Sequence, residues 1–115
     1  MTPTEAEEQI KFVQYLRLKN LPHFRVPNET YTKSWKQKNM NRALGVSKGV
    51  PDLFICLPDK LIAIEMKRTK GSVTSQEQID WIERLNKAGV RSTIAKGCQE
   101  AIAFVELMLK SNKDL

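Results

Sequence analysis

The 115-residue sequence contains few cysteines and a single histidine, and these shortages exclude several kinds of site. Cys56 and Cys98 have neither a CxxC partner nor the spacing of metal ligands, so we expect two buried, reduced thiols. His23 stands alone, which argues against a histidine-based zinc site. No apolar run approaches the roughly 20 residues of a membrane span, and the first residues lack the features of a signal peptide. We therefore expect an intracellular protein with no membrane partner.

The length and charge of the chain narrow the class of protein further. A chain of 115 residues with ordinary composition predicts one domain over residues 1–115 with a substantial core. Its 19 lysines and arginines exceed its 13 aspartates and glutamates, which gives a net charge of +6. This excess favours a polyanionic partner such as nucleic acid but determines nothing about the fold.

Apolar periodicity and turn signals predict an α/β fold. We expect a first helix that begins at Thr2–Pro3 and buries Ile10, Phe12, Val13 and Leu16. Residues 29–48 look irregular. The remaining predicted elements are strands over 23–26, 53–57, 61–67 and 90–95, a helix between Ser75 and Gly89, and a helix over 99–110. This order, α-β-β-β-α-β-α, predicts a mixed sheet of about four strands flanked by helices.

The stretch from Gly49 to Lys67 carries charges where buried strands should have none. Its two apolar runs are joined by a short turn and must form an antiparallel hairpin. Asp52 opens the first strand, whereas Glu65 and Lys67 close the second and share one face. The hairpin brings these charges to one end, about 5 Å apart on neighbouring strands. Asp52 and Glu65 are therefore placed to share a divalent cation; the alternative is a salt bridge on a solvated face.

The same residues resemble a known nuclease family. Pro51–Asp52, twelve further residues and Glu65-x-Lys67 match the signature of the PD-(D/E)xK nucleases. The flanking motifs resemble the VRR-NUC (virus-type replication-repair nuclease) domain over nearly the whole chain. These motifs are Gly45-x-x-x-Gly49, Ser75-x-x-Gln78-x-x-Trp81, Leu85-x-x-x-Gly89, Glu5-x-Glu7-x-Gln9 and Pro27-Asn28-Glu29. The resemblance implies a restriction-endonuclease-like core and a DNA-hydrolysing enzyme that uses Mg²⁺ or Mn²⁺.

The resemblance also implies roles for particular residues around the cation. Asp52, Glu65 and Lys67 would be catalytic, and the carbonyl oxygen of Met66 would be a further metal ligand. Lys67 would position the attacking water or counter the charge on the phosphorane.

Two further catalytic residues are expected on helices. The family places a catalytic glutamate on the first helix, and position on the apolar face selects Glu5, also as a metal ligand, over Glu8. The alternative for Glu5 is a capping box with Thr2. Gln78 is expected to reach the catalytic pocket, with a capping box with Ser75 as the alternative.

Basic residues concentrate just before Asp52 and just after Lys67. Lysine and arginine neutralise phosphates, and an aromatic face can stack on unpaired bases. The candidate nucleic-acid contacts are Lys33, Trp35, Lys36, Lys38, Arg42, Lys48, Arg68 and Lys70. The alternative is a solvated loop in which Trp35 packs onto the core.

Stand-alone domains of this kind resemble phage and bacterial structure-specific endonucleases, including enzymes that resolve four-way (Holliday) junctions. Symmetric cutting of a junction calls for two active sites and hence a homodimer with C2 symmetry. One alternative is a DNA-binding module that kept the fold and lost catalysis, which the intact Asp52, Glu65 and Lys67 disfavour. Another is an interaction protein whose basic loop binds an acidic partner. The residues do not distinguish junction, flap, duplex and single-stranded DNA.

Overall fold

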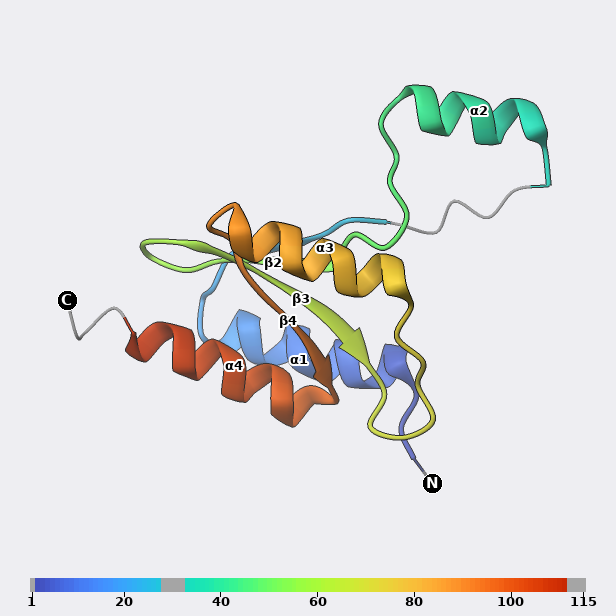
Figure 1. Cartoon of the computed structure of the whole chain (residues 1–115). Helices are drawn as coiled ribbons and strands as arrows, with labels where there is room; N and C mark the ends of the chain where they lie inside the picture. The colour runs from blue at the N-terminus through green and yellow to red at the C-terminus, as the bar shows by residue number, and fades with distance from the viewer. Residues whose placement is uncertain (1, 28–32, 112–115) are drawn as a thin grey trace.

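The computed structural model describes residues 2–27 and 33–111, which form four helices and four strands (Figure 1). In chain order these are α1 (Glu5–Leu18), β1 (His23–Arg25), α2 (Trp35–Ala43), β2 (Leu53–Cys56), β3 (Leu61–Lys67), α3 (Gln76–Lys87), β4 (Arg91–Lys96) and α4 (Cys98–Lys110). No helix within the described ranges is both long enough and apolar enough to cross a membrane.

The four strands form one mixed sheet in the order β1-β2-β3-β4. β1 and β2 are antiparallel, and so are β2 and β3, with Leu53 opposite Ile64 and Cys56 opposite Leu61. β4 runs parallel to β3, so α3 is the crossover that a parallel pair requires. The predictions of an α/β fold and of an antiparallel hairpin are confirmed.

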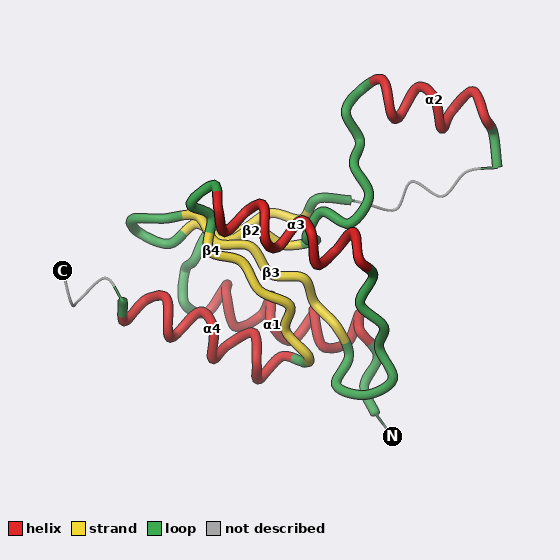
Figure 2. The backbone as a smooth tube through the Cα atoms, in the orientation of Figure 1, coloured by secondary structure: helices red, strands yellow, loops and turns green. Residues whose placement is uncertain are grey.

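Helices cover both faces of this sheet. α1 and α4 lie on one face and α3 lies on the other (Figures 1 and 2). Ile62, Ile64 and Met66 of β3 are fully buried in the core between the sheet and the α1–α4 layer. Because side chains alternate along a strand, Glu65 and Lys67 are directed to the α3 face. β3 therefore contributes apolar side chains to the core on one face of the sheet and two charged side chains to the other face.

The first helix begins later than the sequence suggested, and its buried face is only partly the predicted one. Thr4, not Thr2, is the N-cap, and it forms a capping box with Glu7. Ile10 is 59% exposed, so its predicted place on the buried face is wrong. Phe12 and Leu16 are fully buried and Val13 packs against the core, as predicted. The remaining buried position of the helix is an acid, Glu8, one turn before Phe12.

The segment expected to be irregular contains α2, and that part of the prediction is wrong. Ser34 supplies the reason, because its hydroxyl accepts the N–H of Gln37 and begins the helix. No α2 residue is buried, and Figure 1 shows α2 standing apart from the sheet. Trp35 is 75% exposed, so the alternative that it packs onto the core is also wrong.

The two cysteines differ in their surroundings. Cys98 is buried at the start of α4, as expected, but Cys56 is exposed. The prediction of a buried Cys56 is wrong because it is the last residue of β2, where the chain leaves the sheet for the turn to β3.

Candidate active site

The ends of β2 and β3 bring Asp52 and Glu65 face to face. Leu53 pairs with Ile64, so the preceding Asp52 and the following Glu65 continue the same register. The carbonyl oxygen of Asp52 accepts the N–H of Val26 at 2.7 Å, which ties the position to the segment after β1. Two carboxylates therefore meet at one end of the hairpin.

Gln78 of α3 holds the buried carboxylate of Glu65. Its Nε2 donates to Oε2 of Glu65 at 3.2 Å, and its Oε1 accepts the N–H of Ser75 at 3.0 Å. The hydroxyl of Ser75 accepts the N–H of Gln78 in return. The capping box and the contact with the pocket, two alternatives for Gln78, are thus both present. A single side chain fixes the start of α3 and orients Glu65.

Lys67 lies beside Glu65 at the end of β3. Its Nζ is 3.9 Å from Oε2 of Glu65, and both side chains are almost completely buried. Its carbonyl oxygen accepts the N–H of Gly97 at 2.8 Å, which fastens this end of β3 to the junction of β4 and α4. The side chain of Met66 is in the core, so only the backbone of that residue is available to the site.

Burial and neighbouring carboxylates both disfavour the ionised form of Glu65. Burial, first, and the nearby charge of Asp52, second, raise the pKa of Glu65 to about 8. Lys67 opposes this shift of the pKa, whereas the charge of Glu5 adds to it. A divalent cation would relieve this repulsion, and carboxylate oxygens are the donors that Mg²⁺ and Mn²⁺ prefer.

The carboxylates of Asp52 and Glu65 suit a cation that takes few of its ligands from the protein. Within the described ranges, no three histidine, cysteine or acidic side chains converge into a complete metal cage. Mg²⁺ is commonly held by one or two carboxylates, with waters and substrate phosphates completing its shell. Asp52 and Glu65 match that pattern.

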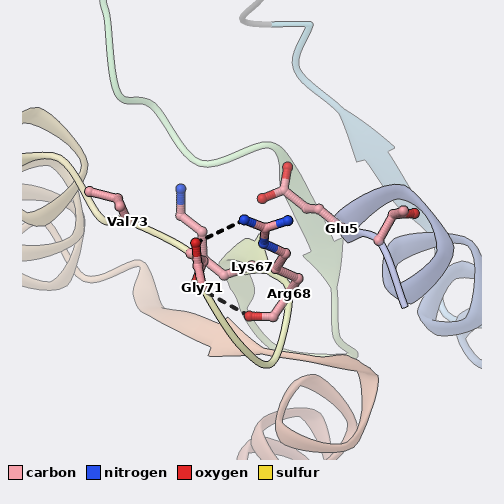
Figure 3. A pocket seen from close by; sticks show the side chains of 7 residues that line it. Glu5, Lys67, Arg68, Gly71 and Val73 are labelled. Atoms are coloured by element: carbon pink, nitrogen blue, oxygen red, sulfur yellow. Dashed lines mark hydrogen bonds between the residues drawn. The ribbon is translucent and has the colours of Figure 1, made fainter. Parts of the chain in front are cut away.

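Glu5 and Glu8 of α1 have different surroundings. The exposed Glu5 lines one pocket of about 400 Å³ with Lys67 and Arg68, and a second of about 270 Å³ with Asp52. Figure 3 shows the side chains of Glu5 and Lys67 extending to the same side of the first pocket.

Glu8 has a structural partner instead. It is 6% exposed, and its Oε1 accepts the N–H of Cys98 at 3.3 Å. Gly97, the N-cap of α4, has no side chain to cap that helix, so Glu8 supplies the cap from α1. The structure therefore brings Glu5, and not the carboxylate of Glu8, to the candidate site.

The predicted nucleic-acid contacts divide into two groups. Arg68 is in the loop beside the site, where its guanidinium donates to the carbonyl of Gly71 at 2.9 Å (Figure 3). On α2, Nζ of Lys38 lies 5.3 Å from the centre of the Trp35 ring. The exposed candidates on or next to α2 are Lys33, Trp35, Lys36, Lys38 and Arg42, and Lys48 and Lys70 are exposed in loops. The structure does not bring the α2 group to the carboxylates (Figure 1).

Sequence reasoning missed one residue beside the site and one that supports its surroundings. Arg25 of β1 lines the smaller pocket with Asp52, and Gly97 approaches the carboxylate of Glu8. A Cβ at Gly97 would lie 2.9 Å from Oε2 of Glu8. Arg25 carried no signal beyond its charge; the only signal for Gly97 was its place between a strand and a helix.

Comparison with known proteins decides the family. The sequence profile of the VRR-NUC domain matches residues 5–99, which is most of the chain. The chain belongs to the VRR-NUC family. A solved structure described as a VRR_NUC domain protein superposes with a TM-score of 0.70 and 24% sequence identity, covering 96% of this chain and 91% of that one. Among curated proteins no sequence matches. The predicted resemblance is thus confirmed, and membership of the family implies a nuclease-type fold.

Proposed function

We propose that this VRR-NUC protein is an endonuclease that hydrolyses DNA phosphodiester bonds with Mg²⁺ or Mn²⁺. The observation that carries the proposal is the juxtaposition of Asp52 and Glu65, with Lys67 beside them, at one end of the hairpin. The raised pKa of Glu65 supports it, because strongly shifted pKa values gather at functional sites.

Each residue would contribute a separate part of the chemistry. When bound, the cation would supply a water of lowered pKa and neutralise charge on the scissile phosphate. Asp52 and Glu65 would hold it, with Glu5 and the carbonyl of Met66 as further ligands. Gln78 would keep Glu65 oriented through its 3.2 Å hydrogen bond. The ammonium of Lys67 would position the attacking water or stabilise the negative charge that develops on the phosphate.

DNA is the partner that the charge distribution favours. Arg68 and Lys70 follow the site, whereas the basic group on α2 lies apart from it. A contact group away from the cutting site suits a substrate that extends beyond one duplex, so we propose branched DNA, with four-way junctions first among the candidates. Acting on such DNA agrees with a location in the cytoplasm of a bacterium or a phage-infected host.

Cutting a junction symmetrically requires a homodimer, and α2 offers a surface for it. Trp35 and Met40 of α2 and Leu44, the C-cap of this helix, are 75%, 53% and 73% exposed, so α2 presents large apolar side chains to a partner. Sedimentation velocity would test this: the wild type is expected to sediment as a dimer and Leu44→Asp as a monomer. A monomeric wild type at micromolar concentration would contradict the homodimer.

The proposal is tested by the cleavage of labelled four-way junction, flap, duplex and single-stranded DNA with Mg²⁺ or Mn²⁺. The wild type is compared with Asp52→Ala and with Glu83→Ala, a control that removes an exposed acid from α3. We expect metal-dependent cutting that Asp52→Ala loses and Glu83→Ala keeps. If no variant cuts but all bind DNA equally, the protein is a non-catalytic DNA-binding module with a nuclease fold.

A further inference from the structure

Two pockets share Glu5 as a wall, and each also includes one further residue of the candidate site, Lys67 or Asp52. The larger is lined by Lys67, Arg68 and the loop to Val73. The smaller is lined by Gln9, Ile10, Arg25 and Asp52. Both pockets include Glu5, and each contains one arginine. A strand whose scissile phosphate sits at the carboxylates would therefore have two separate pockets beside it, each with an arginine.

The smaller pocket has the chemistry of a nucleotide site. Arg25 is exposed and carries the fork of donors that suits a phosphate. Ile10, which is 59% exposed, offers an apolar surface to a sugar or base, and the half-buried Gln9 offers an amide. The volume of about 270 Å³ is just below the range of about 300–1,000 Å³ typical of small-molecule sites. This restricts the occupant to about one nucleotide unit.

The shared walls connect this pocket to the chemistry. Asp52 and Glu5 belong to both the pocket and the cation site, so an occupant of the pocket is a neighbour of the scissile phosphate. Glu5 and Asp52 make one wall of the pocket acidic, which disfavours the binding of a free anion. The binding of a DNA strand is not disfavoured in this way, because the cation neutralises the adjacent phosphate.

We propose that the pocket of Gln9, Ile10 and Arg25 binds the nucleotide next to the scissile phosphate, on the opposite side from Arg68. Arg25 contacts its phosphate, and Ile10 packs against its sugar. The DNA strand thus runs from the loop after β3, across Glu5, to the edge strand β1. This inference rests on the proposed nuclease function and adds to it the path of the cut strand.

The contact between Arg25 and the DNA is tested by measuring the affinity of the protein for fluorescently labelled substrate DNA. Ca²⁺ replaces Mg²⁺ in this measurement to prevent cutting. Arg25→Ala is compared with Arg17→Ala, which removes the same charge from the last turn of α1. Arg25→Ala is expected to weaken binding about fivefold to tenfold and to reduce the salt slope by about 0.7–0.9. Arg17→Ala is expected to change affinity less than twofold. Arg25→Gln, which keeps a polar side chain on the edge strand, should behave as Arg25→Ala.

Neutral methylphosphonates placed one at a time around the cleavage site then locate the contact. One methylphosphonate position should weaken DNA binding by the wild type but not by Arg25→Ala, and this position should lie next to the scissile phosphate. The position that weakens binding by the wild type but not by Arg68→Ala should lie on the other side of the scissile phosphate. Equal binding by Arg25→Ala and Arg17→Ala, or two contacts on the same side, would overturn the proposal. A wild type that binds DNA but never cuts would contradict the nuclease function, while the affinity comparison still decides whether Arg25 contacts DNA.

Discussion

Replacing Glu65 by glutamine should stabilise the metal-free protein. The pKa of this carboxyl is raised to about 8, from about 4.5, so at pH 7 it is mostly protonated in the folded chain and ionised in the unfolded one. The Glu65→Gln change leaves the folded site nearly isosteric and removes the ionisation that favours unfolding. The free energy of unfolding of the variant should therefore exceed that of the wild type wherever Glu65 is ionised in the unfolded chain but protonated in the folded one.

The sign and size of the effect follow from the two pKa values. Below pH 4.5 the carboxyl is protonated in both states, so the two proteins should be equally stable. Between pH 4.5 and 8 the wild type loses about 1.4 kcal/mol per pH unit relative to the variant. The difference is about 3–4 kcal/mol at pH 7, or roughly 15 °C in melting temperature, and it grows further up to pH 8. Above pH 8 both states are ionised and the difference stays constant.

Thermal melts in EDTA at pH 4.5, 6, 7 and 8.5 provide the measurement. Glu83→Gln, an exposed acid on α3, is the control for the change in net charge. An advantage of Glu65→Gln that is absent at pH 4.5 and grows with pH supports the reasoning. A variant that is less stable than the wild type at pH 7, or an advantage independent of pH, would refute it.

Three further experiments test individual contacts. Glu8→Ala removes the cap of α4 and should lower stability by about 1–2 kcal/mol in a melt, yet leave Mn²⁺ binding intact; an unchanged melting temperature contradicts that role. Gln78→Ala and Ser75→Ala each remove part of the capping box of α3 and should lower the free energy of unfolding by about 1 kcal/mol. Only Gln78→Ala should also slow single-turnover cleavage, because, of the two residues, only Gln78 bonds Glu65. Gly49→Ala should destabilise the fold more than Gly45→Ala. Both have positive φ, but the new Cβ at Gly49 would lie 2.6 Å from the α3 backbone and that at Gly45 meets nothing within 4 Å. Equal melting temperatures of Gly49→Ala and Gly45→Ala would contradict that clash.

The hairpin could be predicted from the sequence because its determinants are local. Two apolar runs joined by a short turn admit only antiparallel pairing, and this pairing alone placed Asp52 near Glu65. β3 was predicted with its observed bounds, Leu61–Lys67, since its apolar run ends at charged residues.

The first helix shows where local patterns fail. Its amphipathic pattern is weak, and the carboxylate of Glu8 occupies a buried position because α4 needs a cap that Gly97 cannot provide. That need arises 90 residues away in the sequence, so no periodicity within the helix reveals it. The predicted face therefore included Phe12 and Leu16 correctly but left out the buried Glu8. Glu5, which it selected, is the residue that lines the candidate site.

Pockets depend on contacts between distant segments, and this is why Arg25 was missed. It is on the edge strand β1, whose pairing with β2 brings it beside Asp52. α2 was missed for the opposite reason: it buries no residue, so no apolar face marked it, and only the Ser34 cap indicated where it begins.

The central claim is that Asp52 and Glu65 together hold one divalent cation, and Mn²⁺ binding measured by isothermal titration calorimetry tests it most directly. Wild type is compared with Asp52→Asn, Glu65→Gln and the exposed control Glu83→Gln at pH 8. We predict one Mn²⁺ per chain for wild type and Glu83→Gln, with binding lost in both site variants. Undiminished Mn²⁺ binding by Asp52→Asn or by Glu65→Gln would contradict the account.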